Sequence, residues 1–129
     1  MPLIRIDAII GRSPQQVQDL LEASHRAMLT AFKVPERDRY QIYEEHAPNH
    51  FIVQDTGLDI PRTKNMIIVT VISRPRTEEM KKTFYAELCR ELKAGCGIEP
   101  TDVMVSIVSN TDADWSFGNG RAQFLTGEL

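Results

Sequence analysis

Two mainly apolar stretches alternate along the chain with segments whose apolar positions recur at helical spacing. Residues 3–10 and 66–72 are typical of buried β-strands. Each precedes an amphipathic segment, and the positions of the two predicted helical stripes are Val17, Leu20, Leu21, Ser24, Met28 and Phe32, then Met80, Phe84, Leu88 and Leu92. Shorter strands are predicted at 40–43, 51–53 and 104–107.

Local signals define the ends of both predicted helices. Ser13-Pro14-Gln15-Gln16 provides an N-cap, a proline at the first helical position and a glutamine that completes a capping box. Thr77 caps the second helix, with two glutamates in the first turn, and Gly95 or Gly97 ends it. Both segments are therefore predicted to be single helices.

The second half of the chain repeats the first. An offset of 64 residues aligns about 45 positions without gaps and places Leu3 on Ile67, Ser13 on Thr77 and Asp38 on Asp102. We therefore predict one α/β domain over 1–129, built from two fused β-α-β units at about 2–60 and 66–129, with a four-stranded sheet and two helices on one face. Because the strands are apolar on both faces and no third helix is predicted, a homo-oligomer is expected to cover the other face.

Composition and charge exclude several classes of function. The chain has 129 residues, 42% of them hydrophobic, and a net charge of −3, so we predict no nucleic-acid or membrane partner. Its longest apolar run is strand-sized and no signal segment precedes the first strand, which predicts a cytoplasmic protein. Cys89 and Cys96 are expected to be free thiols. No phosphate-binding loop, nucleophile elbow or CxxC motif occurs.

Pro2 is the most distinctive candidate for chemistry. If Met1 is removed, the chain begins with a secondary amine that titrates near neutrality. The strand that follows would hold this end of the chain in a sheet. The repeat places Met66 opposite Pro2, so only the first unit can present such an amine. The alternative is an ordinary Met-Pro opening without catalytic meaning.

Two arginines and one aspartate are the candidate partners of this amine. Arg74 and Arg76 flank Pro75 at a strand end, where an extended backbone would point both guanidinium groups to the same side, toward one carboxylate. Asp38 precedes the strand predicted to pair beside Pro2; its charge would raise the pKa of the amine, whereas the arginines would lower it. The alternatives are two solvated arginines and a turn aspartate bound to local backbone.

The remaining candidates lie in the C-terminal stretch and in one loop. Trp115, Phe117 and Phe124 would form an apolar wall over a small site, an arm that packs on a neighbouring subunit, or both. His46 and His50 have a spacing seen in metal sites, but no cluster of other ligands in the sequence completes one, so we predict no metal.

These residues resemble the tautomerase superfamily over essentially the whole chain. The resemblance rests on Pro2 at the start of a strand, Gly11-Arg12-Ser13 before a helix, and the paired β-α-β units. The stretches at 38–41, 55–58, 71–76 and 112–118 are most similar to its malonate semialdehyde decarboxylase branch. The resemblance implies a cofactor-independent homotrimer in which Pro2, Asp38, Arg74 and Arg76 are catalytic. Arg74, Arg76, Trp115, Phe117 and Phe124 would bind a small carboxylate substrate.

The implied reaction converts malonate semialdehyde to acetaldehyde and carbon dioxide. Cationic Pro2 would polarise the aldehyde by a hydrogen bond, or an iminium would form. One alternative is an enol-keto tautomerase of the phenylenolpyruvate type, or a hydratase, in which neutral Pro2 acts as the base. Another is a non-catalytic trimer that binds a carboxylate. Tyr40 stands where the hexameric tautomerases have a second arginine, and Met104 and Trp115 argue against dehalogenation. The 44–50 loop departs from the decarboxylases, so it is expected to influence substrate choice.

Overall fold

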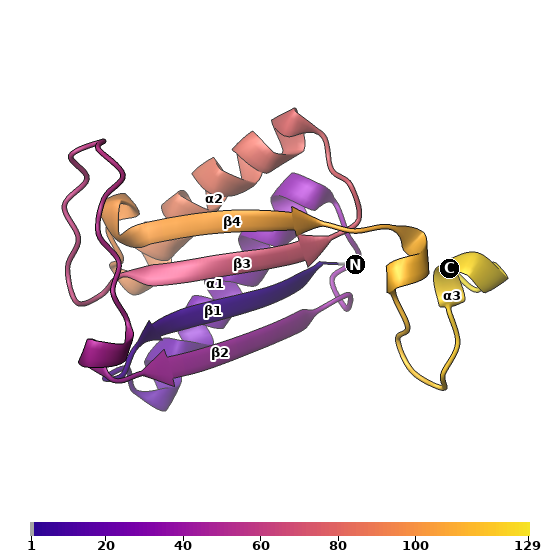
Figure 1. The fold of residues 1–129 in the computed structure, drawn as a ribbon, viewed down its shortest axis with the longest axis horizontal. Helices are drawn as coiled ribbons and strands as arrows, with labels where there is room; N and C mark the ends of the chain where they lie inside the picture. Colours follow the sequence, from indigo (N-terminus) through magenta and orange to yellow (C-terminus); the bar gives the residue numbers. More distant parts are fainter. Residues whose placement is uncertain (1) are drawn as a thin grey trace.

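A mixed four-stranded sheet carries two long helices on one of its faces (Figure 1). The computed structural model describes residues 2–129, so the predicted removal of Met1 lies outside the described residues. The main elements run in the order β1 (Leu3–Ile9), α1 (Pro14–Phe32), β2 (Tyr40–His46), β3 (Ile67–Ser73), α2 (Glu78–Cys96) and β4 (Val103–Ser109). Three 3₁₀ turns, η1 (Pro48–His50), η2 (Pro100–Asp102) and η3 (Asp112–Asp114), and the short helix α3 (Gln123–Thr126) complete the described chain. The two β-α-β units are thus present as predicted.

The order of the strands brings distant parts of the sequence to one end of the sheet. The order is β2-β1-β3-β4, with β1 parallel to β2 and antiparallel to β3. Leu3 therefore pairs with Tyr40 on one side and with Ile72 on the other. Since β4 runs parallel to β3, the starts of β1 and β2 and the ends of β3 and β4 all lie at the same end (Figure 1).

The predicted helix signals are confirmed. Ser13 accepts a hydrogen bond from the backbone of Gln16, whose side chain accepts one from the backbone of Ser13 in return. Thr77 caps α2 in the same way through the backbone of Met80. Of the two glycines predicted to end α2, Gly97 is the C-cap, with a left-handed φ of 66° that glycine adopts at little cost.

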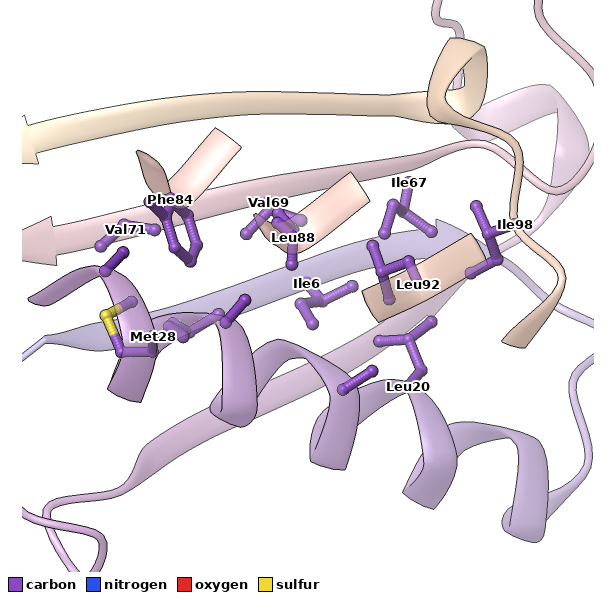
Figure 2. Close-up of a cluster of buried hydrophobic side chains, with 14 of the residues drawn as sticks. Ile6, Leu20, Met28, Ile67, Val69, Val71, Phe84, Leu88, Leu92 and Ile98 are labelled. Atoms are coloured by element: carbon purple, nitrogen blue, oxygen red, sulfur yellow. The ribbon is translucent and has the colours of Figure 1, made fainter. Parts of the chain in front are cut away.

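The hydrophobic core lies between the sheet and the two helices (Figure 2). Alternate residues of β1 and β3 point into it and meet the apolar stripes of both helices. The labelled members of this cluster are Ile6, Leu20, Met28, Ile67, Val69, Val71, Phe84, Leu88, Leu92 and Ile98. Neither helix is long and apolar enough to cross a membrane, nor is any other helix of residues 2–129.

Leu88→Ala is expected to lower the free energy of unfolding by about 2–5 kcal/mol, because Leu88 is fully buried and the substitution leaves a cavity in the core. Tyr85→Ala, three residues away on the same helix, is the matched control because Tyr85 is exposed. Urea unfolding of both variants measures the difference. Equal losses would contradict this assignment of the core.

As expected, the two helices cover only one face of the sheet in the single chain. In β1 and β3 buried residues alternate with half-buried ones, so the face away from the helices is only partly covered. Ile42 of β2 and Met104 and Val108 of β4 are exposed there. The apolar pattern shows which side chains avoid water but not which molecule covers them.

Two local predictions also require correction. Residues 51–53 form no strand, because no neighbouring strand pairs with them; Ile52 is exposed and Phe51 instead stacks on His46. The prediction that the chain has no third helix missed α3. This single turn lies in the C-terminal segment, beyond the end of the sheet (Figure 1).

Candidate active site

Four chain segments converge at the end of the sheet where β1 begins. Pro2 is buried immediately before β1, and Asp38 lies two residues before β2. Arg74 and Arg76 follow the last residue of β3, and the segment after β4 contributes Trp115. The antiparallel pairing of β1 with β3 is what places residues of the second unit beside the amino end of the first.

A buried histidine fixes the loop that bears Asp38. Nε2 of His25 donates to the carbonyl oxygen of Glu36 across 2.7 Å, and the His25 side chain is 6% exposed. The backbone N–H of Asp38 donates to the carbonyl of Pro35 at 2.9 Å, which closes a turn. Asp38 is consequently held at 9% exposure, near enough to Arg76 for its charge to raise the pKa of that arginine.

Arg76 is anchored at the centre of this region. Its Nε donates to Oγ of Ser73 at 3.1 Å, and its guanidinium lies over the ring of Phe32 at 4.9 Å. Burial, followed by the positive charge of Arg74, lowers the pKa of Arg76 from its ordinary value, while the charge of Asp38 opposes this. The guanidinium stays charged at neutral pH because arginine is not deprotonated in proteins.

Arg74 is held differently from Arg76. Its Nη1 donates to Oδ1 of Asp112 at 3.1 Å, and its guanidinium lies 3.9 Å from the centre of the Phe124 ring. Its buried Nε has no hydrogen-bond partner within residues 2–129. Thus the two arginine charges are close enough to interact, but in this state they stack on different rings, Phe124 and Phe32.

Aromatic side chains of the C-terminal segment form a connected wall. Phe117 stacks on Trp115 at 5.5 Å and on Tyr40 of β2 at 5.8 Å, and it meets Phe124 edge-on at 5.3 Å. The indole N–H of Trp115 donates to Oδ1 of Asn110 at 2.7 Å. Gln123 accepts from the backbone N–H of Phe117 and donates to the carbonyl of Gly118, so it fastens the turn between them.

Asn110→Ala is expected to loosen this wall, because it removes the acceptor of the Trp115 indole. Trp115 is the only tryptophan in the sequence, so its fluorescence reports on the site directly. We expect emission shifted to longer wavelength and stronger quenching by acrylamide. Ser116→Ala changes an exposed neighbour and is the control. Unchanged emission and quenching in Asn110→Ala would show that this hydrogen bond does not order the wall.

A cavity of about 430 Å³ opens beside Asp38 and the wall. Its lining residues include Pro35, Arg37, Asp38, Tyr40 and Phe117, and the last residues of the chain close one side. Its volume is in the range of small-molecule sites. Asp38 and Phe117 thus share one cavity, whereas Pro2 and the two arginines are not among its lining residues.

The amino-acid sequence of this chain matches two known protein families. Residues 38–118 match a family described as "Tautomerase enzyme", and residues 2–59 match a second family with the same description. The chain belongs to the tautomerase superfamily. It is also 52% identical, over all 129 residues of both chains, to a Bacillus subtilis (strain 168) protein described as "Probable tautomerase YrdN".

Solved structures of malonate semialdehyde decarboxylases share both fold and sequence with this tautomerase-superfamily enzyme. One is 50% identical with a TM-score of 0.96, covering 98% of each chain. It was solved as wild type, as an inactivated form and with its first residue changed from proline to alanine, and decarboxylase and hydratase activities are ascribed to it. Another, inhibited by 3-bromopropiolate, is 39% identical with a TM-score of 0.93, covering 98% of this chain and 97% of its own.

The contacts of several residues around the candidate active site could not be predicted from the sequence. His25 is buried and supports the Asp38 loop, although nothing in the helical segment around it indicates this contact. Phe32 lies against Arg76, 44 positions apart in the chain, and Asp112 pairs with Arg74, 38 positions apart. Only the distance between folded elements, not a spacing along the chain, identifies these contacts.

Of the two histidines with metal-like spacing, only His46 lies in a cluster of possible metal ligands within residues 2–129. This cluster is on the open face of the sheet, the face away from the two helices. His46 lies with Asp7 and Glu44, and their ligand atoms are all within 4.8 Å of one another. The two carboxylates come from positions that the His spacing did not include. Arg5 pairs with both of them, and His46 Nε2 lies 2.7 Å from Asp7. The cluster is therefore a network of ion pairs, and we assign no metal to it.

Proposed function

We propose that this enzyme decarboxylates a small 3-oxo acid, converting malonate semialdehyde to acetaldehyde and carbon dioxide. The observation that supports this most strongly is the convergence of Pro2, Asp38, Arg74 and Arg76 at one end of the sheet. The chain bearing these four residues is 50% identical to a malonate semialdehyde decarboxylase. In the proposal, removal of Met1 gives Pro2 a free secondary amine.

Substrate binding would depend on the two arginines. A planar guanidinium can donate two parallel hydrogen bonds to one carboxylate. Arg76 is preorganised for this by Ser73 and Phe32, whereas Arg74 would exchange Asp112 for the substrate. Holding the carboxylate between two cations would orient the bond to be broken perpendicular to the plane of the aldehyde, where its electrons overlap with the carbonyl π system.

Pro2 would act as the acid. As the bond to the carboxylate breaks, its electron pair forms a carbon–carbon double bond and the carbonyl π electrons move to oxygen. The protonated amine stabilises this developing enolate by a hydrogen bond. Protonation of the former α-carbon then gives acetaldehyde. The carboxylate of Asp38 would favour the cationic form of Pro2.

The aromatic wall would limit access of water. Trp115, Phe117 and Phe124 form its apolar surface, and Phe124 also covers Arg74. Because the negative charge spreads from the carboxylate onto the enolate as carbon dioxide leaves, a site of low polarity favours this more dispersed charge over the localised carboxylate. The same exclusion strengthens the hydrogen bond from Pro2 to the enolate oxygen.

An enol-keto tautomerase, or a hydratase, is the second candidate function, favoured by the description of the 52% identical relative as a probable tautomerase. In that reaction neutral Pro2 would remove a proton. Parallel assays of malonate semialdehyde and phenylenolpyruvate distinguish the candidates by kcat/KM. Reduction with borohydride during turnover tests the iminium version of the decarboxylase, because a modified Pro2 would reveal it.

The intact mass of the purified protein tests the premise shared by both enzymatic candidates. A mass without Met1 is expected. A protein that retains Met1 has no free Pro2 amine, and this result would favour the carboxylate-binding module over either enzyme.

We further propose that three chains assemble through the open faces of their sheets. Apolar side chains on that face support the proposal; they are Leu3, Ile9, Ile42, Ile68, Ile72, Met104 and Val108. Ile42→Glu is expected to reduce the mass in light scattering from three times 14.7 kDa toward that of one chain. Gln18→Glu adds the same charge on the helical layer and is the control. Wild type of monomer mass would refute the trimer.

A further inference from the structure

A second cavity lies at the opposite end of the sheet from Pro2, where β1 ends and β3 begins (Figure 1). Its volume is about 480 Å³, within the range of small-molecule sites. The residues that line it come from the end of β1, the start of α1, the segment before β3 and the end of α2; they include Ile9, Arg12, Gln16, Asp19, Lys64 and Cys96.

The internal repeat relates this cavity to the candidate active site. The offset of 64 residues places Arg12 on Arg76, each following the end of a strand and preceding a helix. The same offset places Cys96 on Phe32, the last residues of α2 and α1. In the first site Arg76 lies over Phe32; in the second the charge of Arg12 acts on Cys96. The two sites therefore share one arrangement, an arginine after a strand beside the last residue of a helix.

The groups needed for the proposed chemistry are missing from the second site. Met66, buried within the chain, occupies the position of Pro2 and has no free amine. Asp102, which corresponds to Asp38, accepts hydrogen bonds from the backbone and the hydroxyl of Thr63 at 2.7 and 2.6 Å. This aspartate fixes the loop before β3 and is 1% exposed.

The groups that would bind an anion remain. Arg12 uses Nη2 to donate to the carbonyl of Asn65 at 2.7 Å, which fixes the guanidinium beside the cavity. Lys64 contributes a second positive charge to the lining, and Asp19 a single negative one. Ile98 is among the apolar residues of the lining, which suits a short carbon chain.

We propose that this cavity is a second binding site, in which Arg12 and Lys64 hold a small aliphatic carboxylate that is bound but not transformed. The guanidinium of Arg12 donates two parallel hydrogen bonds to the carboxylate, and the ammonium group of Lys64, on its flexible side chain, adds a second positive charge at the edge of the cavity. The inference stands on the cavity and the repeat, and it does not depend on which reaction occurs at Pro2.

Cys96 provides a local reporter for occupancy of this cavity. It lines the cavity, whereas Cys89 lies two turns earlier in α2 and does not. Both thiols are half-buried, and burial raises the pKa of each, so they can be compared at one alkaline pH. The experiment measures alkylation of each cysteine by iodoacetamide, with peptide mass spectrometry, as malonate is added to the full-length protein.

We expect malonate to slow alkylation of Cys96 and to leave Cys89 unchanged, while malonamide, its neutral analogue, protects neither. Arg12→Gln should raise the half-protecting malonate concentration by about tenfold or more, since it removes a charge-assisted bond. Lys64→Gln should raise it by about two- to fivefold, because Lys64 is exposed and its removal does not disturb the packing. Lys93→Gln, which removes a charge from the same end of α2 outside the cavity, is the matched control.

Three outcomes would overturn the proposal: no protection of Cys96, equal protection of both cysteines, or equal protection by malonamide. Equal protection of both would indicate general stabilisation. Protection of Cys96 that persists in Arg74→Gln would separate this cavity from the candidate active site. An enzyme without decarboxylase activity but with selective protection would refute the proposed function and leave the second site intact.

Discussion

Pro2→Ala is expected to lower kcat/KM for malonate semialdehyde by about 10²- to 10⁴-fold, the usual contribution of a positioned acid. Alanine is also small, so Met1 should still be removed, and the new terminus is a primary amine without the ring that fixes its direction. The proposed contacts of Arg74 and Arg76 with the substrate carboxylate should be unchanged, so the loss should appear mainly in kcat. Acetaldehyde formation, followed by proton NMR, measures it.

Two controls separate chemistry from folding in Pro2→Ala. Its intact mass must show the same processing as wild type, and its midpoint of urea unfolding must stay close to that of wild type. A correctly processed and folded variant with wild-type kcat would exclude Pro2 from catalysis.

Arg76→Gln is expected to lower kcat/KM by about a hundredfold, because each charge-assisted hydrogen bond to the substrate contributes about 1.5–3 kcal/mol. Glutamine also removes the positive charge of Arg76, with which the charge of Asp38 interacts. The measurement is steady-state kinetics with malonate semialdehyde, and we expect the larger change in KM.

The conservative variant Arg76→Lys should retain part of the activity, since it keeps the charge but loses the fork that binds a carboxylate through two bonds. Arg90→Gln removes an exposed arginine that pairs with Glu87 on α2, and it should leave the kinetics unchanged. A KM for Arg76→Gln equal to that of wild type would show that Arg76 does not bind the substrate.

Local chemistry explains why much of the fold was predictable from the sequence. The caps at Ser13 and Thr77 depend on residues within one helical turn, so the sequence contains all of their determinants. The repeat likewise relates Leu3 to Ile67 and the first helix to the second. The expected pairing of the 40–43 strand beside β1 is confirmed by the Leu3–Tyr40 register.

Features that depend on a distant partner were missed or mispredicted. Residues 51–53 have a strand-like composition, but a strand exists only where another strand accepts its hydrogen bonds. The stack of Arg76 on Phe32 and the pairing of Arg74 with Asp112 depend on how α1 and the C-terminal segment pack against the sheet end. The convergence of the arginines on one carboxylate stays a prediction.

The aromatic wall was likewise predictable only in part from the sequence. The aromatic residues of the C-terminal stretch predicted an apolar wall, and the proposed lining residues Trp115, Phe117 and Phe124 do form one cluster. The side chain that fastens it, Gln123, has no distinguishing signal in the sequence. Its role follows from two hydrogen bonds that span Phe117 and Gly118.

The most direct test of the account is the dependence of kcat/KM for malonate semialdehyde on pH. If cationic Pro2 is the acid, kcat/KM is constant while the amine is protonated and falls about tenfold per pH unit above its pKa. The falling limb should coincide with the titration of the Pro2 nitrogen followed by ¹⁵N NMR. A kcat/KM that instead rises as Pro2 loses its proton would contradict the account and identify Pro2 as a base.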